Sequence, residues 1–255
     1  MDLQLFYSLI VGIFVGGTAG FLGSLMITKR MALVGDALGH VALPGVALAL
    51  IYGFNVSWGA LPCLALGIVL IWFLEMKTKL PMEALTGIVF TASVAIAFLF
   101  LPESEVSTAL VGDISQINLS DTFISVILSL MVFLILRNIF SQMILINLSE
   151  ELAYVEHVEV KKYNLIYLIC IALIVAFGIK VTGSLLMGAL VITPAAAARN
   201  IARNLFQYSY GSLIIGALSC AIGILLFKSL GLPAGPLIIL IASFIFLISL
   251  VFRKK

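Results

Sequence analysis

An aspartate and a histidine, Asp36 and His40, stand four residues apart in a segment that is otherwise apolar or small. On an α-helix this spacing places both side chains on one face, one turn apart. A carboxylate with an imidazole suits zinc, manganese or iron better than calcium or sodium. The pair is therefore a candidate for a metal pathway. The alternative is a structural role, in which Asp36 hydrogen-bonds a neighbouring helix and a backbone carbonyl group satisfies His40.

Motifs for several other kinds of chemistry are absent from the sequence. It has no Gly-x-x-x-x-Gly-Lys-Ser/Thr, so it cannot hold ATP by a P-loop, and any dependence on ATP must come from another subunit. It also lacks His-Glu-x-x-His and Gly-x-Ser-x-Gly, which disfavours an intramembrane hydrolase. Cys63, Cys170 and Cys220 lie in apolar runs without Cys-x-x-Cys spacing, so we expect apolar filler.

Membrane helices must position the candidate residues. Of the 255 residues, 63% are apolar and 10% are charged, and the mean hydropathy is +1.25. A run of about 20 apolar residues crosses the hydrocarbon core as a helix. We therefore expect an all-α transmembrane bundle that forms a single membrane domain over residues 1–255. Nine spans are predicted, or eight if one is re-entrant, near residues 5–28, 32–53, 57–76, 83–101, 121–137, 163–179, 181–199, 211–228 and 234–252.

The basic residues predict the orientation of these spans. With nine spans, one side of the membrane receives Lys29, Arg30, Lys77, Lys79, Arg137, Lys161, Lys162, Arg199, Arg203 and residues 253–255. By the positive-inside rule that side is cytoplasmic, so the N-terminus is outside and the C-terminus is cytoplasmic. Lys180 and Lys228 are exceptions at span ends, where a long side chain can reach the interface. Asp36 then lies about 9 Å and His40 about 15 Å into the membrane, where a charged carboxylate needs a partner or a wet cavity.

Prolines and glycines indicate where the spans break and pack. Pro44 and Pro194 lie inside the second and seventh predicted spans, where each would kink or break the helix. Broken membrane helices accompany protein-lined cavities, so these spans are the expected pathway. Gly12, Gly16 and Gly20 recur every fourth residue in the first span, which predicts the close approach of another helix.

Two polar connections are long, one external at residues 102–121 and one cytoplasmic at 138–162. In the second, Ser149 would cap a short helix with Glu150 and Glu151 in its first turn. Leu152, Val155 and Tyr154 would give this helix an apolar face. The pattern fits a solvated loop helix and a docking helix for a cytoplasmic partner equally well. His157, the only other histidine, is expected at the surface.

The stretch from Gly35 to Ala47 resembles the most distinctive motif of the membrane permeases of zinc- and manganese-type ABC importers, which usually has Ser at the position of Gly39. Four later segments resemble further elements of that family in the same order. They are 110–114 with Gly112-Asp113-Ile114, 150–153, 183–199 with Thr193-Pro194-Ala195-Ala196, and 232–235. The resemblance covers nearly the whole chain. Relatives often have Gly where this chain has His157.

The resemblance implies a transporter subunit of a bacterial inner membrane rather than an enzyme. Its implied partners are a second copy of this chain, two cytoplasmic ATP-binding subunits and an extracellular solute-binding protein that delivers the ion; no nucleic acid is expected. Zn²⁺, Mn²⁺ or Fe²⁺ would be cargo, with no permanently bound cofactor. We hypothesise that Asp36 and His40 of both copies line the route, with Asp113 as a further candidate. Within 149–160, the residues expected to couple to the ATPase are Glu150, Glu151, Leu152, Tyr154 and Val155.

Two other transport functions remain open from the residues. A permease for metal chelates such as cobalamin or siderophores needs a wide cavity without ion ligands, which Asp36 and His40 oppose. A proton-driven secondary transporter would use Asp36 as the proton carrier and would need no ATPase. The residues do not distinguish zinc, manganese and iron, because the ligand preferences of these ions overlap.

Overall fold

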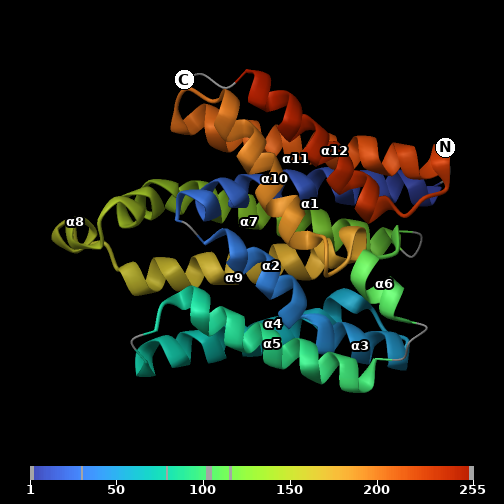
Figure 1. Ribbon diagram of the computed structural model, residues 1–255, viewed down its shortest axis with the longest axis horizontal. Coiled ribbons are helices and arrows are strands. Elements are labelled where there is room, and N and C mark those ends of the chain that lie inside the picture. Colours follow the sequence, from blue (N-terminus) through green and yellow to red (C-terminus); the bar gives the residue numbers. More distant parts are fainter. Residues whose placement is uncertain (1–2, 30, 79, 102–104, 115–116, 253–255) are drawn as a thin grey trace.

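The computed structural model describes residues 3–29, 31–78, 80–101, 105–114 and 117–252. Arg30, Lys79 and residues 253–255, which entered the prediction of orientation, lie outside the described residues. All of the regular structure in the described residues is helical (Figure 1). The helices are α1 (Leu3–Thr28), α2 (Ala32–Val41), α3 (Leu43–Tyr52), α4 (Val56–Lys77), α5 (Met82–Phe100), α6 (Val106–Val111), α7 (Leu119–Leu148), α8 (Glu150–Val155), α9 (Val160–Thr182), α10 (Met187–Ile201), α11 (Leu205–Leu230) and α12 (Ala234–Val251).

The predicted all-α bundle of eight to nine spans is confirmed. Eight segments of the described chain are long and apolar enough to cross a membrane, with α2 and α3 forming one of them (34–52). The predicted span 181–199 corresponds to α10, which has 15 residues and is too short for that criterion. Figure 1 shows that α1 begins and α12 ends at opposite ends of the molecule, as an odd number of crossings requires. The ninth crossing, through α10, stays a prediction.

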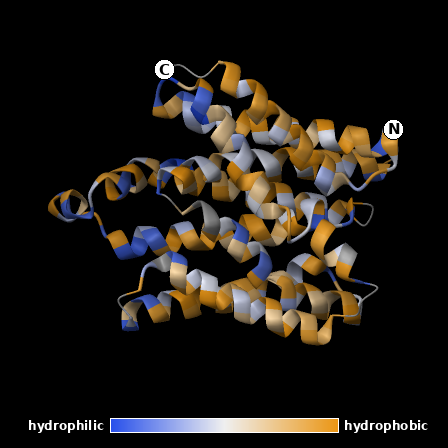
Figure 2. Cartoon of the chain, viewed as in Figure 1, coloured by the Kyte–Doolittle hydropathy of each residue, from blue (hydrophilic) through white to orange (hydrophobic). Residues whose placement is uncertain are grey.

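Helix α7 is longer than predicted and makes one end of the bundle project. The predicted fifth span ended at residue 137, but α7 continues to Leu148 over 30 residues, a length of about 45 Å. This exceeds the hydrocarbon core of about 30 Å, and α8 lies beyond the other helices (Figure 1). We call this the α8 end and the opposite end the α6 end. Figure 2 shows hydrophilic stretches gathered mainly towards the helix ends.

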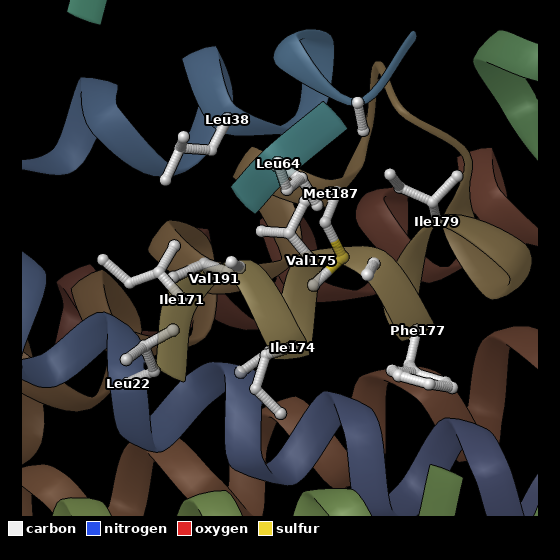
Figure 3. Close-up of a cluster of buried hydrophobic side chains, with 14 of the residues drawn as sticks. Leu22, Leu38, Leu64, Ile171, Ile174, Val175, Phe177, Ile179, Met187 and Val191 are labelled. Atoms are coloured by element: carbon white, nitrogen blue, oxygen red, sulfur yellow. The ribbon is translucent and has the colours of Figure 1, made fainter. Parts of the chain in front are cut away.

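Helix α1 is largely buried and packs directly on α11 through its glycines. A Cβ atom on Gly20 would lie 2.2 Å from the carbonyl oxygen of Ser212, and one on Gly16 would lie 2.9 Å from that of Gly216. Such contacts bring two helix backbones together, as the spacing of Gly12, Gly16 and Gly20 predicted. Figure 3 shows the adjoining apolar core, in which side chains of α9 meet those of α1, α2, α4 and α10.

The second predicted span breaks next to Pro44, as we expected, but the seventh does not break at Pro194. The chain leaves regular helix at Ala42, between α2 and α3, and Pro44 lies in the first turn of α3. There Pro44 loses no hydrogen bond, because the first N–H groups of a helix have no partner within it. Helix α10 runs through Pro194 without interruption. The irregular stretch instead precedes α10, at residues 183–186.

A buried ion pair ties three parts of the α6 end together. The predicted exception Lys180 does not reach for the interface; it donates to Oδ2 of Asp121 at 2.5 Å, and both side chains are about nine-tenths buried. Asn55, at the start of α4, donates to Oδ1 of the same carboxylate at 2.5 Å. Asp121 also accepts from the backbone N–H of Asn118, closing a capping box at the start of α7. One carboxylate thus joins α4, α7 and α9.

We predict that Asp121→Asn lowers the free energy of unfolding by about 3 kcal/mol, because the Lys180 ammonium would stay buried without its counter-ion. Lys180→Met should cost a similar amount by stranding the carboxylate. Thermal or denaturant unfolding in detergent micelles measures both. The double variant Asp121→Asn/Lys180→Met should lose less than the sum of the single losses. Additive losses would show that the two groups do not interact.

Candidate functional site

Helix α2, which carries Asp36 and His40, lies between α5 and α10. Its contact with α10 is a backbone contact, since a Cβ atom on Gly188 would lie 2.5 Å from Cα of Asp36. One turn along α2, a Cβ atom on Gly39 would lie 2.6 Å from the carbonyl oxygen of Ser184. The family motif usually has Ser at this position. Gly39 has no side chain, and this permits the close approach of Ser184 to α2. These two contacts fix the face that α2 presents to α5.

That face contains a cavity of about 210 Å³ between α2 and α5. The half-buried Asp36 lines it, opposite Glu83, Thr86 and Phe90 of α5. The His40 ring packs beside the Phe90 ring, with 5.1 Å between the centroids, and its Nδ1 atom is buried without a hydrogen-bond partner. The structure thus places Asp36 in the wall of this cavity and His40 against Phe90, another residue that lines it.

The structural role considered for this pair finds no support among the described residues. No hydrogen bond or salt bridge in the described part of the chain involves the Asp36 carboxylate, and no backbone carbonyl accepts from His40. A buried imidazole nitrogen without a partner is costly in a protein interior. An aspartate within a membrane segment is costly too unless a cavity hydrates it or a cation neutralises it. Both groups are therefore available to a ligand.

One copy of the chain does not complete a metal centre. Among the described residues, no three or more His, Cys, Asp or Glu side chains are grouped so that they could hold a metal ion. Asp113 follows α6 and does not line the cavity with Asp36. Its role in the metal pathway stays a prediction. Asp36 and His40 offer two ligands, which is fewer than a stable zinc site uses.

Sequence reasoning did not identify the α5 side of this cavity. Glu83, Thr86 and Phe90 all fall on one helical face, so the 3.6-residue period contained the signal. Glu83 is also one of only 12 acidic residues in the chain and stands in the first turn of a membrane helix. What the sequence alone could not supply was the pairing of α5 with α2, which is a tertiary contact.

At the α8 end, the predicted short helix forms and carries exposed apolar side chains. Ser149 caps α8 by accepting from the backbone N–H of Leu152 at 3.3 Å, as predicted. The exposed fractions of Leu152, Tyr154 and Val155 are 55%, 59% and 72%. Only Ala153 of this helix is buried. Because α8 projects past the other helices (Figure 1), this apolar surface lies at the tip of the molecule.

His157 supplies the backbone conformation that a glycine would supply. Its φ angle is +56°, in the left-handed region. The N–H of Val158 donates to the carbonyl of Ala153 at 2.8 Å and the N–H of His157 to that of Tyr154 at 3.1 Å, which is the Schellman pattern that ends many helices. The turn therefore forms without the glycine, since histidine tolerates this region better than most residues do.

Lys29 connects the central helix α1 to this end. Its Nζ donates to Oδ1 of Asn164 on α9 at 2.6 Å and lies 5.6 Å from the centre of the Tyr167 ring. Burial lowers the pKa of Lys29, and the negative charges of Glu150 and Glu75 oppose that effect. The side chain thus places a positive charge between the end of α1 and the first residue of α8.

Comparison with known proteins agrees with this architecture. The chain matches the ABC 3 transport family over residues 1–253. It is 30% identical to the manganese import system permease protein ScaB of Streptococcus gordonii, over 97% of this chain and 91% of ScaB. It is 31% identical to the high-affinity zinc uptake system membrane protein ZnuB of Haemophilus influenzae, over 98% of each. The solved structure of PsaBC from Streptococcus pneumoniae in complex with Fab matches with a TM-score of 0.85 and 29% identity, over 98% of this chain and 91% of that chain.

The family match over a multi-pass helical bundle defines the chain as a membrane permease subunit, distinct from the ATPase subunit of such transporters. The chain belongs to the ABC 3 transport family. It is therefore part of an ABC transporter, and the resemblance drawn from Gly35 to Ala47 is confirmed. Because this family is driven by ATP, its match to the chain argues against a proton-driven secondary transporter.

We predict that Gly188→Ala lowers the unfolding temperature and displaces α2. The added methyl group would overlap Cα and Cβ of Asp36, and overpacking of this kind costs about 1–3 kcal/mol. Thermal unfolding of the purified chain in detergent measures the effect. Gly211→Ala is the matched control, because its Cβ atom would meet only Ala198 at 3.5 Å. Since alanine favours a helix over glycine, that variant should be at least as stable as the parent; equal stability of both variants would contradict the close contact.

Proposed function

We propose that this chain carries divalent transition-metal ions into the cytoplasm as the permease of an ABC importer, with manganese or zinc as the cargo and iron as a third candidate. The observation that carries the proposal is the pair Asp36 and His40 on a membrane-embedded helix, where Asp36 lines a cavity and His40 packs on Phe90 of the same cavity wall. Neither side chain has a hydrogen-bond partner among the described residues. Relatives that import manganese and zinc support the same class of cargo.

The transported ion is held by two copies of the chain. Each copy offers Asp36 and His40, so a homodimer with its symmetry axis beside α2 and α5 offers four ligands of the borderline kind that these ions prefer. A homodimer also explains why each copy leaves both groups without a partner. The half-exposed carboxylate keeps binding weak enough for release, which a transporter requires and a closed structural zinc site does not permit.

Two ATP-binding subunits drive the cycle, and an extracellular binding protein delivers the ion to the α6 end. The docking element for the ATPase is the segment 149–160, in which Leu152, Tyr154 and Val155 enter the partner's cleft while Glu150 and Glu151 lie at its rim. Three exposed apolar side chains on a helix that projects into water support this role, since such a surface marks a protein interface. Rigid-body movement of α8 would then reach the spans through α7 and α9.

We expect Asp36→Asn and His40→Ala each to abolish metal uptake while the complex with the ATPase still assembles. Each change removes one ligand from each copy and halves the number available to the ion. Uptake of radioactive Mn²⁺ and Zn²⁺ into cells lacking other importers gives the measurement, and copurification of the ATPase reports assembly.

Glu75→Gln is the control for this experiment, because it also removes a carboxylate from a membrane helix but does not line the cavity. It should retain uptake. Parental uptake by both Asp36→Asn and His40→Ala would remove the pair from the mechanism. ATP hydrolysis by the reconstituted complex and its binding protein, measured with each metal in turn, would identify the cargo.

A photo-crosslinking residue at Tyr154 or Val155 should form a covalent adduct with the ATPase subunit in the assembled transporter. Both side chains are exposed at the tip of α8, within reach of a cytoplasmic partner. The same residue at Leu99, which is 78% exposed on α5, should form no adduct with the ATPase. An intact complex in which neither α8 position crosslinks would exclude this segment as the coupling element.

A further inference from the structure

Two adjoining cavities lie at the α8 end, away from the Asp36 cavity. The first has a volume of about 540 Å³ and lies among the ends of α1 and α10 and the start of α11. Its polar lining consists of Thr28, Arg199, Arg203, Asn204 and Tyr208. The second has a volume of about 460 Å³ and extends between α10 and α12. Arg199 lines both, so the two cavities can receive one ligand.

The charge in this region is positive, and no ion pair of the described residues neutralises it. The sequence has no aspartate or glutamate after Glu159, although basic residues continue to the C-terminus. The ion pairs of the described residues involve Lys162 and Lys180, and neither includes Arg199 or Arg203. Two guanidinium groups on one cavity therefore favour an anion, and their planar donors suit phosphate in particular.

A buried hydroxyl group beside the first cavity is only weakly satisfied. Tyr208 is only 7% exposed, and its phenol oxygen makes no short hydrogen bond with the described residues. Its polar neighbour is the Thr28 hydroxyl, which donates to the carbonyl of Ser24 at 2.7 Å and interacts with Tyr208 only at longer range. The 26-residue helix α11 begins at Leu205, so the positive end of its dipole faces the same space. The Asn204 side chain already caps this terminus by accepting from the N–H of Gln207 at 2.7 Å, so an anion in the cavity would add a strong acceptor for the Tyr208 hydroxyl.

We propose that these cavities bind one anionic phospholipid of the inner leaflet, with its phosphate group on Arg199 and Arg203 and its glycerol and acyl chains in the second cavity. Ile201, Phe246 and Leu250 give the second cavity an apolar wall. Leu205, which lines the first cavity, is 48% exposed, which suits contact with lipid. Basic pockets between transmembrane helices at the cytoplasmic side are a known form of lipid headgroup site.

The test titrates the full-length chain in dodecyl maltoside micelles with dioctanoyl phosphatidylglycerol, and native mass spectrometry counts the lipid that stays bound. Parent protein should bind it at least tenfold more tightly than dioctanoyl phosphatidylcholine. Arg199→Gln/Arg203→Gln should weaken binding by about tenfold or more, the size expected when charge-assisted hydrogen bonds to phosphate are lost. Tyr208→Phe, which removes only the hydroxyl group, should weaken it by a smaller factor.

Lys161→Gln/Lys162→Gln is the matched control, since it removes the same charge from the same end of the molecule at exposed positions and should leave binding within a factor of about two. An equal loss in this control would overturn the site in favour of diffuse attraction. Inorganic phosphate that displaces the lipid at equal concentration would assign the site to a soluble phosphate compound. Unchanged lipid binding by Arg199→Gln/Arg203→Gln, with loss of the ATPase during copurification, would assign the arginines to protein docking.

Discussion

The backbone contact between α2 and α10 determines where the Asp36 carboxylate lies. Because Gly188 has no side chain, α10 approaches the Cα atom of Asp36 directly, and Gly39 allows the same approach to Ser184. Gly188 also lies against Oδ1 of Asp36, and the same side chain lines the cavity between α2 and α5. A membrane helix that carries an aspartate is tolerable only when its carboxylate meets water or a cation. The glycines thus determine the position of the carboxylate on which the proposed metal route depends.

Close packing through glycines also places α1 at the centre of the molecule. Helix α1 is in addition connected to the α8 end. Helix α1 packs on α11 through Gly16 and Gly20, so little relative movement is available to the two backbones. At its other end, Lys29 binds Asn164 and lies within electrostatic reach of Glu150. A displacement of α8 would therefore be felt by α1 and α9 together. The proposed coupling needs only such a rigid path and no local flexibility.

Much of this architecture could be predicted from local sequence. The spacing of Asp36 and His40, the cap at Ser149 and the break at Pro44 each depend on residues within a few positions of one another. The end of α7 was misplaced because Arg137 and Asn138 interrupt the hydropathy, although neither interrupts a helix. A polar residue lowers the hydropathy by which a membrane span is recognised. The helix itself ends only where its backbone hydrogen bonds stop.

Other features depend on contacts between distant segments and carry no local signal. The exception at Lys180 is explained by Asp121, which lies 59 positions away. The α5 wall of the candidate site depends on the pairing of α2 with α5. His157 illustrates a third case, because a family pattern with glycine suggests an altered turn, yet the turn forms with a histidine at φ +56°. The residue type at position 157 does not decide this backbone conformation, because the hydrogen bonds of the His157 and Val158 N–H groups already favour it.

Alternating access requires the two ends of the route to open in turn. At the α6 end, hydrogen bonds connect the segment before α10 to helix α6. Ser184 donates to the carbonyl of Ala109 through its N–H at 3.2 Å and its hydroxyl at 2.9 Å, and the N–H of Leu185 donates to Leu110 at 3.1 Å. Each bond contributes about 1 kcal/mol net, so the three together amount to a few kcal/mol, the usual gap between two populated states. The contact of Ser184 with Gly39 makes α2 part of the same unit. Opening at this end must therefore either break these bonds or carry α2 along, and in both cases it changes the surroundings of Asp36 and His40.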